Sequence, residues 1–298
     1  MKESRIPFLK MTGSGNDFIL IDNRQMVISP EKAPELARKA CRHKLSVGAD
    51  GLILVENDKE VDFSWRFFNS DGSEAEMCGN GARCAARFAV LKGIVKSSSM
   101  VFRTGAGFIQ AEITGSTQVK VQIPGISEAK LNIPVTLSEL EGIEKLSISS
   151  IDPAQNHIVV HFANTGVPHV VIFCKDRQEL DSVDVVKLGR FIRFHPQFSP
   201  RGTNVNFVWV ASENEIFIRT YERGVEDETL ACGTGSIAGA IISSALGKTH
   251  SPVAVNTKGG ESLRVFFSKK MEGFSDVFLE GQALVVYEGL LWDETLVN

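Results

Sequence analysis

The chain has 298 residues, of which 43% are hydrophobic and 23% charged, and its formal net charge at pH 7 is −4. This composition excludes a disordered chain, and the length favours about two domains. Scattered Lys and Arg residues argue against a nucleic-acid-binding protein and favour a small-molecule partner. Because residues 1–10 form no secretory leader and no apolar run approaches the length of a membrane span, we expect a cytoplasmic protein with no membrane partner.

The first part of the chain predicts two pairs of strands with a helix between them. The glycines of the loop 12–17 allow its backbone to approach another group closely. Ser29-Pro30 indicates the start of the helix, in which Cys41 occupies an apolar, core-facing position. The strands are expected at residues 8–11, 18–21, 52–55 and 63–68.

The next stretch, Cys78-Gly79-Asn80-Gly81, places a cysteine immediately before two glycines and an apolar helical run that Gly93 ends. At the start of a helix, free backbone N–H groups and the helix dipole stabilise a thiolate and can hold an anion. Alternating apolar residues from 101 to 123 then predict antiparallel strands joined by glycine turns. Residues 124–134 are polar and marked by prolines, which indicates a connection between two halves of the chain.

The second half repeats this arrangement, including a second cysteine motif, Cys232-Gly233-Thr234-Gly235, before the apolar run 237–242. A helix is expected at 182–194. Strands are expected at residues 157–162, 170–173, 203–210, 215–221, 253–256, 263–267, 276–279 and 283–287. The recurrence indicates a weak internal duplication with a period of roughly 150 residues.

Two thiols at two helix starts suit the inversion of a stereocentre that carries an acidic hydrogen. One group must remove the proton from one face while another delivers a proton to the opposite face. A thiol serves either role, because its unperturbed pKa of about 8.5 can be lowered toward the working pH by a helix N-terminus. The N–H donors of the same helix starts can hold a substrate carboxylate as it gains negative charge.

The remaining cysteines and the histidines give no metal or disulfide pattern. The five cysteines form neither an even set nor paired C-x-x-C motifs, so we expect free thiols in a reducing compartment. The six histidines show no H-E-x-x-H or similar spacing, and no metal site is predicted.

Several motifs together resemble the diaminopimelate epimerase family, and they follow one another in the family's order over nearly the whole chain. They are Gly13–Asp17, Phe68–Cys84, Pro168-His169, Tyr221–Gly224 and Ala231–Gly235. The resemblance implies an isomerase that interconverts LL- and meso-diaminopimelate by two-base chemistry for lysine and peptidoglycan synthesis, without pyridoxal phosphate, metal or other cofactor. A homodimer is common in the family.

The resemblance also implies the fold and the domain limits. The expected class is α+β, with two pseudo-symmetric domains that each wrap a curved antiparallel sheet around a central helix, and with the active site in the cleft between them. The N-terminal domain covers residues 1–126 with Cys78 and is completed by the C-terminal strand 282–298. The second domain covers residues 127–281 with Cys232.

Residue by residue, the resemblance assigns the two catalytic bases to Cys78 and Cys232. His169 and Glu222 are expected beside them, where they orient the substrate ammonium group and tune the thiols. Gly79, Asn80, Gly233 and Thr234 correspond to the helix starts that receive the reacting carboxylate. The residues that hold the distal end of the substrate are expected to be Asn16, Asn69, Asn204 and Arg223.

Two departures from the family pattern concern substrate preference. Val167 replaces an asparagine found in many members before the Pro-His pair, and Asn164 is a candidate to compensate. Gly51 stands where some members carry a substrate-contacting glutamine. A racemase for glutamate, histidine or proline is therefore the alternative within this fold. A thiol redox protein that joins Cys78 and Cys232 in a reversible disulfide is the alternative of a different class.

Overall fold

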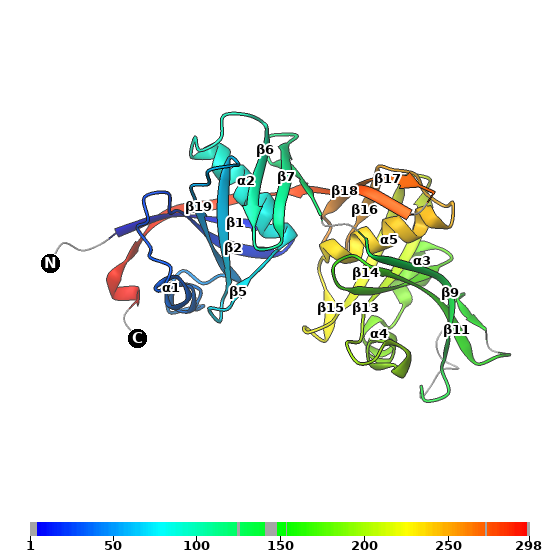
Figure 1. Ribbon diagram of the computed structural model, residues 1–298. Coiled ribbons are helices and arrows are strands. Elements are labelled where there is room, and N and C mark those ends of the chain that lie inside the picture. Colours follow the sequence, from blue (N-terminus) through cyan, green and yellow to red (C-terminus); the bar gives the residue numbers. More distant parts are fainter. Residues whose placement is uncertain (1–4, 124–125, 141–147, 153, 272, 297–298) are drawn as a thin grey trace. The chain divides into compact units, whose positions relative to one another are not determined.

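The computed structural model describes residues 5–123, 126–140, 148–152, 154–271 and 273–296, and the chain divides into two compact units. Unit 1 comprises Met1–Ile123 with Glu280–Asn298, and unit 2 comprises Pro124–Leu279. Blue to green-cyan segments together with the red C-terminal segment form unit 1 in Figure 1, and green to orange segments form unit 2. The C-terminal strand therefore returns to the N-terminal unit.

Unit 1 is built from strands around a long helix, α2, with a shorter helix, α1, on another face. Its elements are β1 (Arg5–Gly13), β2 (Asn16–Asp22), α1 (Ala33–Ala40), β3 (Gly51–Glu56), β4 (Phe63–Asn69), β5 (Glu74–Ala75), α2 (Gly79–Leu91), β6 (Ser99–Thr104), β7 (Gly107–Ile113), β8 (Gln118–Gln122), β19 (Leu284–Trp292) and η3 (Asp293–Leu296).

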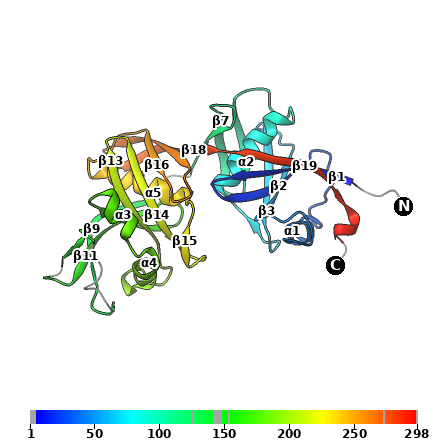
Figure 2. The same ribbon diagram turned by 180° about the vertical axis from the view of Figure 1, so that it is seen from behind.

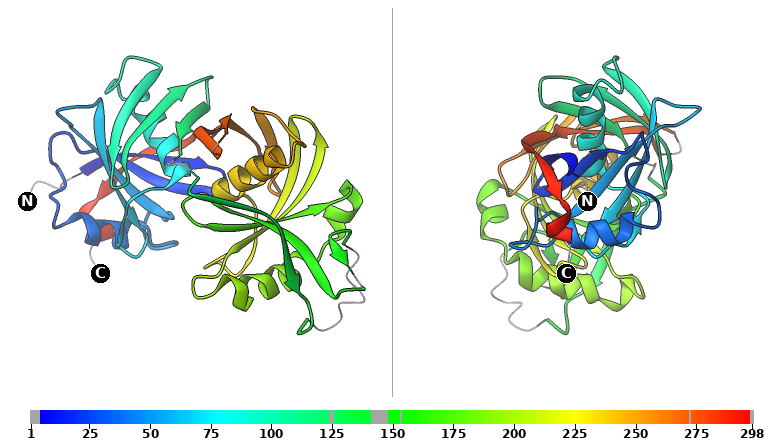
Figure 3. Two further views of the ribbon diagram at one scale, coloured as in Figure 1. Left: turned by 45° about the vertical axis from the view of Figure 1, so that its right-hand side comes forward. Right: turned by 90° about the vertical axis from the view of Figure 1, so that its left-hand side faces the viewer.

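Unit 2 has the same plan, with α5 as its long helix (Figure 3). Its elements are β9 (Glu128–Thr136), β10 (Ile151–Asp152), β11 (His157–Asn164), β12 (Pro168–Cys174), α3 (Arg177–Ser182), α4 (Val185–Phe194), η2 (Pro196–Phe198), β13 (Asn204–Ser212), β14 (Glu215–Glu222), β15 (Asp227–Thr229), α5 (Gly233–Ala245), β16 (Val253–Asn256), β17 (Ser262–Lys270) and β18 (Gly273–Gln282), of which β18 runs on into unit 1.

The strand pairing repeats in the two units. In unit 1, β1 pairs antiparallel with β2, β2 parallel with β3, β3 antiparallel with β4, and β4 parallel with β6. In unit 2 the same sequence of pairings runs through β11, β12, β13, β14 and β16. In both units the long helix follows a short strand, β5 or β15, that pairs with the strand before it. The predicted internal duplication is therefore confirmed, and each sheet is mixed rather than purely antiparallel.

Strands β2 and β3 of unit 1 are apolar on both faces because a helix covers each face. Side chains along a strand alternate between the two faces. Ile19 and Ile21 of β2 pack in one cluster with the apolar side of α1. On the other face, Ile53 of β3 lies against Gly81 of α2. The continuous apolar runs of β2 and β3 are typical of strands buried on both faces.

The same alternation separates two sets of residues in unit 2. Val205 and Phe207 of β13 pack with α4, whereas Val208 lies against Gly239 of α5. Asn204 and Asn206 therefore share the α5 face of the sheet. Figure 2 shows α4 below β13 and β14, and α4 contacts both strands. A polar cluster thus lies between the sheet and α5.

Three predicted elements differ from the structure. The predicted connection 124–134 contains β9, which pairs antiparallel with β11, while residues 124–125 lie outside the described residues. Most of β9 is exposed, so it lacks the apolar alternation that reveals a buried strand. The helix predicted at 182–194 is divided into α3 and α4, because Asp184 caps a new helix by accepting the Lys187 N–H. The helix predicted from Ser29-Pro30 begins at Ala33.

Within the described part of the chain, no helix is long and apolar enough to cross a membrane.

Candidate active site

Cys78 is the N-cap residue of α2, as predicted. Its backbone is extended (φ −146°, ψ 116°), and its Sγ accepts the Gly81 N–H at 3.5 Å. Gly79 is the first residue of the helix, and the side chain of Cys78 is half-buried. The structure therefore places this thiol beside free N–H groups at the positive end of a helix.

A chain of hydrogen bonds connects the start of α2 with the first residue of β2 and with Asp50. Arg83, which is fully buried in α2, donates to Asn80 Oδ1 at 2.8 Å. Asn80 Nδ2 donates to Asn16 Oδ1 at 2.8 Å, and Asn16 Nδ2 donates to Asp50 Oδ2 at 2.9 Å. Asn69, by contrast, lies at the end of β4 and donates to Ser73 Oγ. Unit 1 thus joins two predicted residues, Asn16 and Asn80, directly, and Arg83 and Asp50 extend the chain at its two ends.

Cys232 stands in the same position of unit 2, as the N-cap residue of α5. Its backbone is also extended (φ −133°, ψ 111°), Gly233 begins the helix, and its Sγ lies 3.5 Å from Thr234 Oγ1. Thr234 Oγ1 lies 2.9 Å from Nε2 of His169, which is 0% exposed. Unit 2 therefore brings three predicted residues, Cys232, Thr234 and His169, into one hydrogen-bonded group.

The other predicted residues of unit 2 lie at the ends of β13 and β14. Asn204 Nδ2 donates to Pro168 O, and Asn204 Oδ1 accepts the Arg223 N–H at 2.8 Å. The Arg223 guanidinium donates to Arg201 O. Glu222 is the last residue of β14, and its carboxylate acts on the Cys232 thiol electrostatically. Asn204 therefore links the strand that carries His169 with the turn that carries Arg223.

The thiols are harder to ionise than their helix positions predict. Burial raises the pKa of Cys232 to about 11, and the charge of Glu222 acts in the same direction, against the Thr234 hydroxyl and the nearby backbone amides. Burial also raises the pKa of Cys78, against the Gly81 and Asn80 amides and the charge of Arg83. The expected lowering of the two pKa values is not found, because desolvation outweighs the effect of the helix start.

His169 and Glu222 are shifted toward their neutral forms. The pKa of His169 is lowered to about 3, chiefly by burial and in part by the positive charge of Arg223. Burial also raises the pKa of Glu222. At neutral pH, His169 is therefore a neutral imidazole that donates one hydrogen bond and accepts another.

A glutamine in place of Glu222 should make Cys232 more reactive. Glu222→Gln removes the negative charge that raises the Cys232 pKa, so the pKa should fall below about 11. At pH 8 the fraction of thiolate should then increase at least about twofold, since one pKa unit is tenfold. Iodoacetamide labelling with peptide-resolved mass spectrometry measures this rate, with Cys78 as the internal reference. An unchanged Cys232 rate would show that Glu222 does not act on the thiol.

Gly51 leaves no room for the glutamine that some family members carry. A Cβ at this position would lie 2.7 Å from Phe68 O and 2.5 Å from the Phe67 ring.

Asn164, the candidate to compensate for Val167, has a buried Oδ1 for which the described residues provide no hydrogen-bond donor.

Sequence reasoning missed four polar residues that support these groups: Arg83, Asp50, Asn206 and Thr220. Asn206 of β13 lies opposite Thr220 of β14 where the two strands pair. The sequence does contain one indication of Asn206, since Asn204 and Asn206 alternate with Val205 and Phe207. Polar residues on one face of an otherwise buried strand need hydrogen-bond partners.

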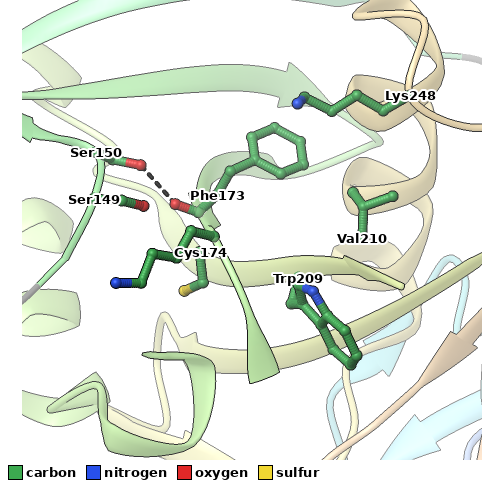
Figure 4. A pocket seen from close by; sticks show the side chains of 8 residues that line it. Ser149, Ser150, Phe173, Cys174, Trp209, Val210 and Lys248 are labelled. Carbon is green, nitrogen blue, oxygen red and sulfur yellow. Dashed lines mark hydrogen bonds between the residues drawn. The ribbon is translucent and has the colours of Figure 1, made fainter. Parts of the chain in front are cut away.

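A pocket of about 270 Å³ lies elsewhere in unit 2 and contains none of the predicted residues. Figure 4 shows Cys174, Trp209 and Lys248 around it, and the Ser150 hydroxyl donates to Phe173 O at 2.6 Å. Burial raises the pKa of Cys174 to about 12, so its thiol is unreactive at neutral pH.

Among the described residues, no group of three or more His, Cys, Asp or Glu side chains could hold a metal ion.

Comparison with known sequences agrees with the geometry. The sequence model described as diaminopimelate epimerase matches residues 8–125 and 161–272, and each stretch contains one of the N-cap cysteines. The diaminopimelate epimerase of Aquifex aeolicus is 46% identical, covering 97% of this chain and 99% of that protein. The diaminopimelate epimerase of a Hydrogenobaculum species is 47% identical, covering 95% and 97%.

Solved structures with low sequence identity share the fold. A Bacillus anthracis phenazine biosynthesis protein of the PhzF family superposes with a TM-score of 0.72 at 16% identity, over 97% of this chain and 99% of that one. A hydroxyproline epimerase from Agrobacterium vitis, with trans-4-hydroxy-L-proline bound, gives 0.63 at 12% identity, over 97% and 92%.

Proposed function

The chain belongs to the diaminopimelate epimerase family, isomerases of lysine biosynthesis that interconvert LL- and meso-diaminopimelate, and we propose that Cys78 and Cys232 are the two bases with which it does so. The observation that carries this assignment is the repeated geometry: each unit places one half-buried thiol at the N-cap of its long helix. In the proposed reaction, one thiolate removes the α-proton and the other thiol protonates the opposite face.

For this reaction the two units act as the two domains of one enzyme. We propose that the Cys78 thiol acts on one face of the substrate α-carbon and the Cys232 thiol on the opposite face. The helix starts at Gly79-Asn80 and Gly233-Thr234 receive the α-carboxylate, whose charge grows as the carbanion forms.

The substrate itself helps one thiol to ionise on this account. Glu222 faces the substrate ammonium group, whose positive charge offsets the carboxylate that raises the Cys232 pKa. His169, held neutral by burial, supports Thr234 beside the same thiol. The distal end of the substrate is bound by Asn16, Asn69, Asn204 and Arg223, of which Arg223 can grip both oxygens of a carboxylate.

Substrate choice is tested with a panel of amino acids. Purified protein without added cofactor is incubated with LL-diaminopimelate, meso-diaminopimelate, and the L isomers of glutamate, histidine and proline. We expect the LL and meso isomers to interconvert until their ratio is constant, and we expect no racemisation of the other amino acids. Chiral chromatography measures the isomers in each reaction. Turnover of a single-centre amino acid with none of diaminopimelate would replace the proposed substrate.

We further propose a homodimer formed through β19. This strand pairs with β1 along one side. Val286, Leu290 and Trp292 are 55%, 50% and 37% exposed, and their even spacing puts them on one face of the strand. Exposed apolar side chains that share one face are typical of an interface, and a second copy can cover them symmetrically.

Charges on this surface should separate the dimer. Val286→Lys combined with Leu290→Lys should change the sedimentation coefficient at micromolar concentration from that of a dimer to that of a monomer, because two buried ammonium groups would oppose association. Val186→Lys, at a 43% exposed position of α4, is the matched control and should remain dimeric. A wild-type protein that sediments as a monomer would contradict the dimer.

We place the protein in the cytoplasm. The proposed chemistry requires Cys78 and Cys232 as reduced thiols, and a reducing compartment keeps thiols in that state.

A further inference from the structure

His169 makes one hydrogen bond through each ring nitrogen. Nε2 lies 2.9 Å from Thr234 Oγ1, and Nδ1 lies 3.1 Å from Asn206 Nδ2. Both His169 and Asn206 are 0% exposed, so water does not replace either partner. Which nitrogen carries the proton therefore depends on which atom of the Asn206 amide faces the ring.

The orientation of the Asn206 amide is fixed by two other groups. Its Nδ2 lies 2.8 Å from Val170 O, which can only accept a hydrogen bond. Its Oδ1 accepts from the Thr220 hydroxyl at 3.0 Å. A rotated amide would set two oxygens against each other at 2.8 Å, so Nδ2 must face both Val170 O and His169 Nδ1.

We propose that Asn206, oriented by Val170 and Thr220, is a positioning residue that fixes His169 as the Nε2–H tautomer and thereby directs the Thr234 hydroxyl proton toward Cys232. Because Nδ2 donates to Nδ1, the ring proton resides on Nε2 and is donated to Thr234 Oγ1. Thr234 then has its own proton free to donate to Cys232 Sγ, 3.5 Å away. The series Thr220, Asn206, His169, Thr234 and Cys232 donates in one direction toward the thiolate.

The surroundings favour this arrangement over a charged histidine. Arg223 is the charged group that acts on His169, and its positive charge opposes protonation of the ring. Glu222 is the charged group that acts on Cys232, and it disfavours the thiolate. A hydroxyl that donates to the sulfur opposes this effect by stabilising the thiolate. Gly235 completes the site, because a Cβ there would lie 2.4 Å from Asn206 Oδ1.

The tautomer can be observed directly by NMR. Protein labelled with ¹⁵N-histidine gives separate signals for protonated and unprotonated ring nitrogens, and the His169 signals are assigned by their loss in His169→Gln. In the wild type at pH 7 to 8, Nε2 should be protonated and Nδ1 unprotonated. In Asn206→Asp, a carboxylate oxygen replaces the Nδ2 donor, so Nδ1 should become protonated. A wild-type ring protonated on Nδ1 would overturn the proposal, as would an unchanged Nδ1 in a folded Asn206→Asp variant.

A reactivity measurement tests the connection to the thiol. Asn206→Ala and Thr234→Val should each slow iodoacetamide labelling of Cys232 at pH 9 by at least about threefold, while Cys78 keeps its rate. If the two residues act through one chain, the double variant should be no slower than Thr234→Val alone. Additive effects would mean that Asn206 acts by another route and would overturn the proposal.

The matched control is Asn23→Ala. Asn23 is also 0% exposed, and its side chain likewise makes three hydrogen bonds, to Ile28 O, the Ile28 N–H and Glu56, but it lies in unit 1. This variant should leave the His169 tautomer and the Cys232 labelling rate unchanged. This inference rests on the proposed function only in treating Cys232 as a catalytic base. Neither experiment uses diaminopimelate, so the hydrogen-bond chain and the proposed function can be contradicted separately.

Discussion

Cys78→Ala and Cys232→Ala should each lower kcat for diaminopimelate epimerisation by about 10²- to 10⁴-fold or more in both directions. General acid–base groups commonly contribute rate factors of this size, and each variant removes either the base or the acid of every turnover. The measurement is isomer conversion followed by chiral chromatography under reducing conditions, so that oxidation of the thiols cannot imitate the loss.

Cys174→Ala is the control for this experiment. Cys174 is a buried cysteine of unit 2 with a pKa raised to about 12, and it lines the pocket that lacks the predicted residues. Its loss should leave kcat within about twofold of the wild type, since substitutions away from a site act through stability. Full activity in either Cys78→Ala or Cys232→Ala would contradict the two-base assignment.

Gly235→Ala should impair both the stability of unit 2 and its activity. The added Cβ would lie 2.4 Å from Asn206 Oδ1 and 3.3 Å from Cys232 Sγ. Asn206 cannot move without breaking its hydrogen bonds to Val170, Thr220 and His169. The expected loss is about 1 to 3 kcal/mol in the free energy of unfolding, the usual cost of overpacking, with kcat lowered at least about tenfold.

Gly239→Ala gives the matched comparison one turn further along α5. There a Cβ would lie 3.2 to 3.4 Å from the side-chain ends of Ile216, Ile218 and Val208, which can shift. The higher helix propensity of alanine should offset part of this crowding, so activity should be kept. Urea unfolding and initial rates of both variants check the prediction. Equal effects of the two substitutions would show that helix crowding, and not Asn206, is responsible.

The features of the fold that were predicted correctly depend on local sequence. Cys-Gly-x-Gly before an apolar run predicted the starts of α2 and α5, because glycines and a capping residue determine where a helix begins. The apolar runs of β2 and β3 were equally clear, because a strand buried on both faces has few polar residues. β9 was not predicted, because most of its residues are exposed and show no apolar alternation. Its strand conformation depends on pairing with β11 more than on its own residues.

The polar support of the site could not be predicted, because it depends on register between distant strands. Asn206 meets His169 only because β12 and β13 pair in parallel, with His169 opposite Asn204. Thr220 reaches Asn206 through the pairing of β13 with β14. No spacing within the chain indicates either contact.

The pKa values of the thiols show a second limit of sequence reasoning. A helix start predicts an easily ionised cysteine, and the sequence contains both helix starts. It does not show how deeply each thiol is buried or that the charge of Glu222 raises the pKa of Cys232. The direction of the shift follows from the folded environment, in which burial is the larger effect.

Deuterium uptake from solvent shows whether inversion of the α-carbon proceeds through two exchangeable thiols. Wild-type protein is incubated with LL-diaminopimelate in deuterated, reducing buffer without added cofactor, and the product is examined by NMR and mass spectrometry. In the initial phase, every molecule of meso product should carry one deuterium at the inverted α-carbon, because the second thiol delivers a proton that has exchanged with solvent. Meso product formed with retention of the original α-hydrogen, or no exchange at the α-carbon of either isomer, would contradict the two-base assignment.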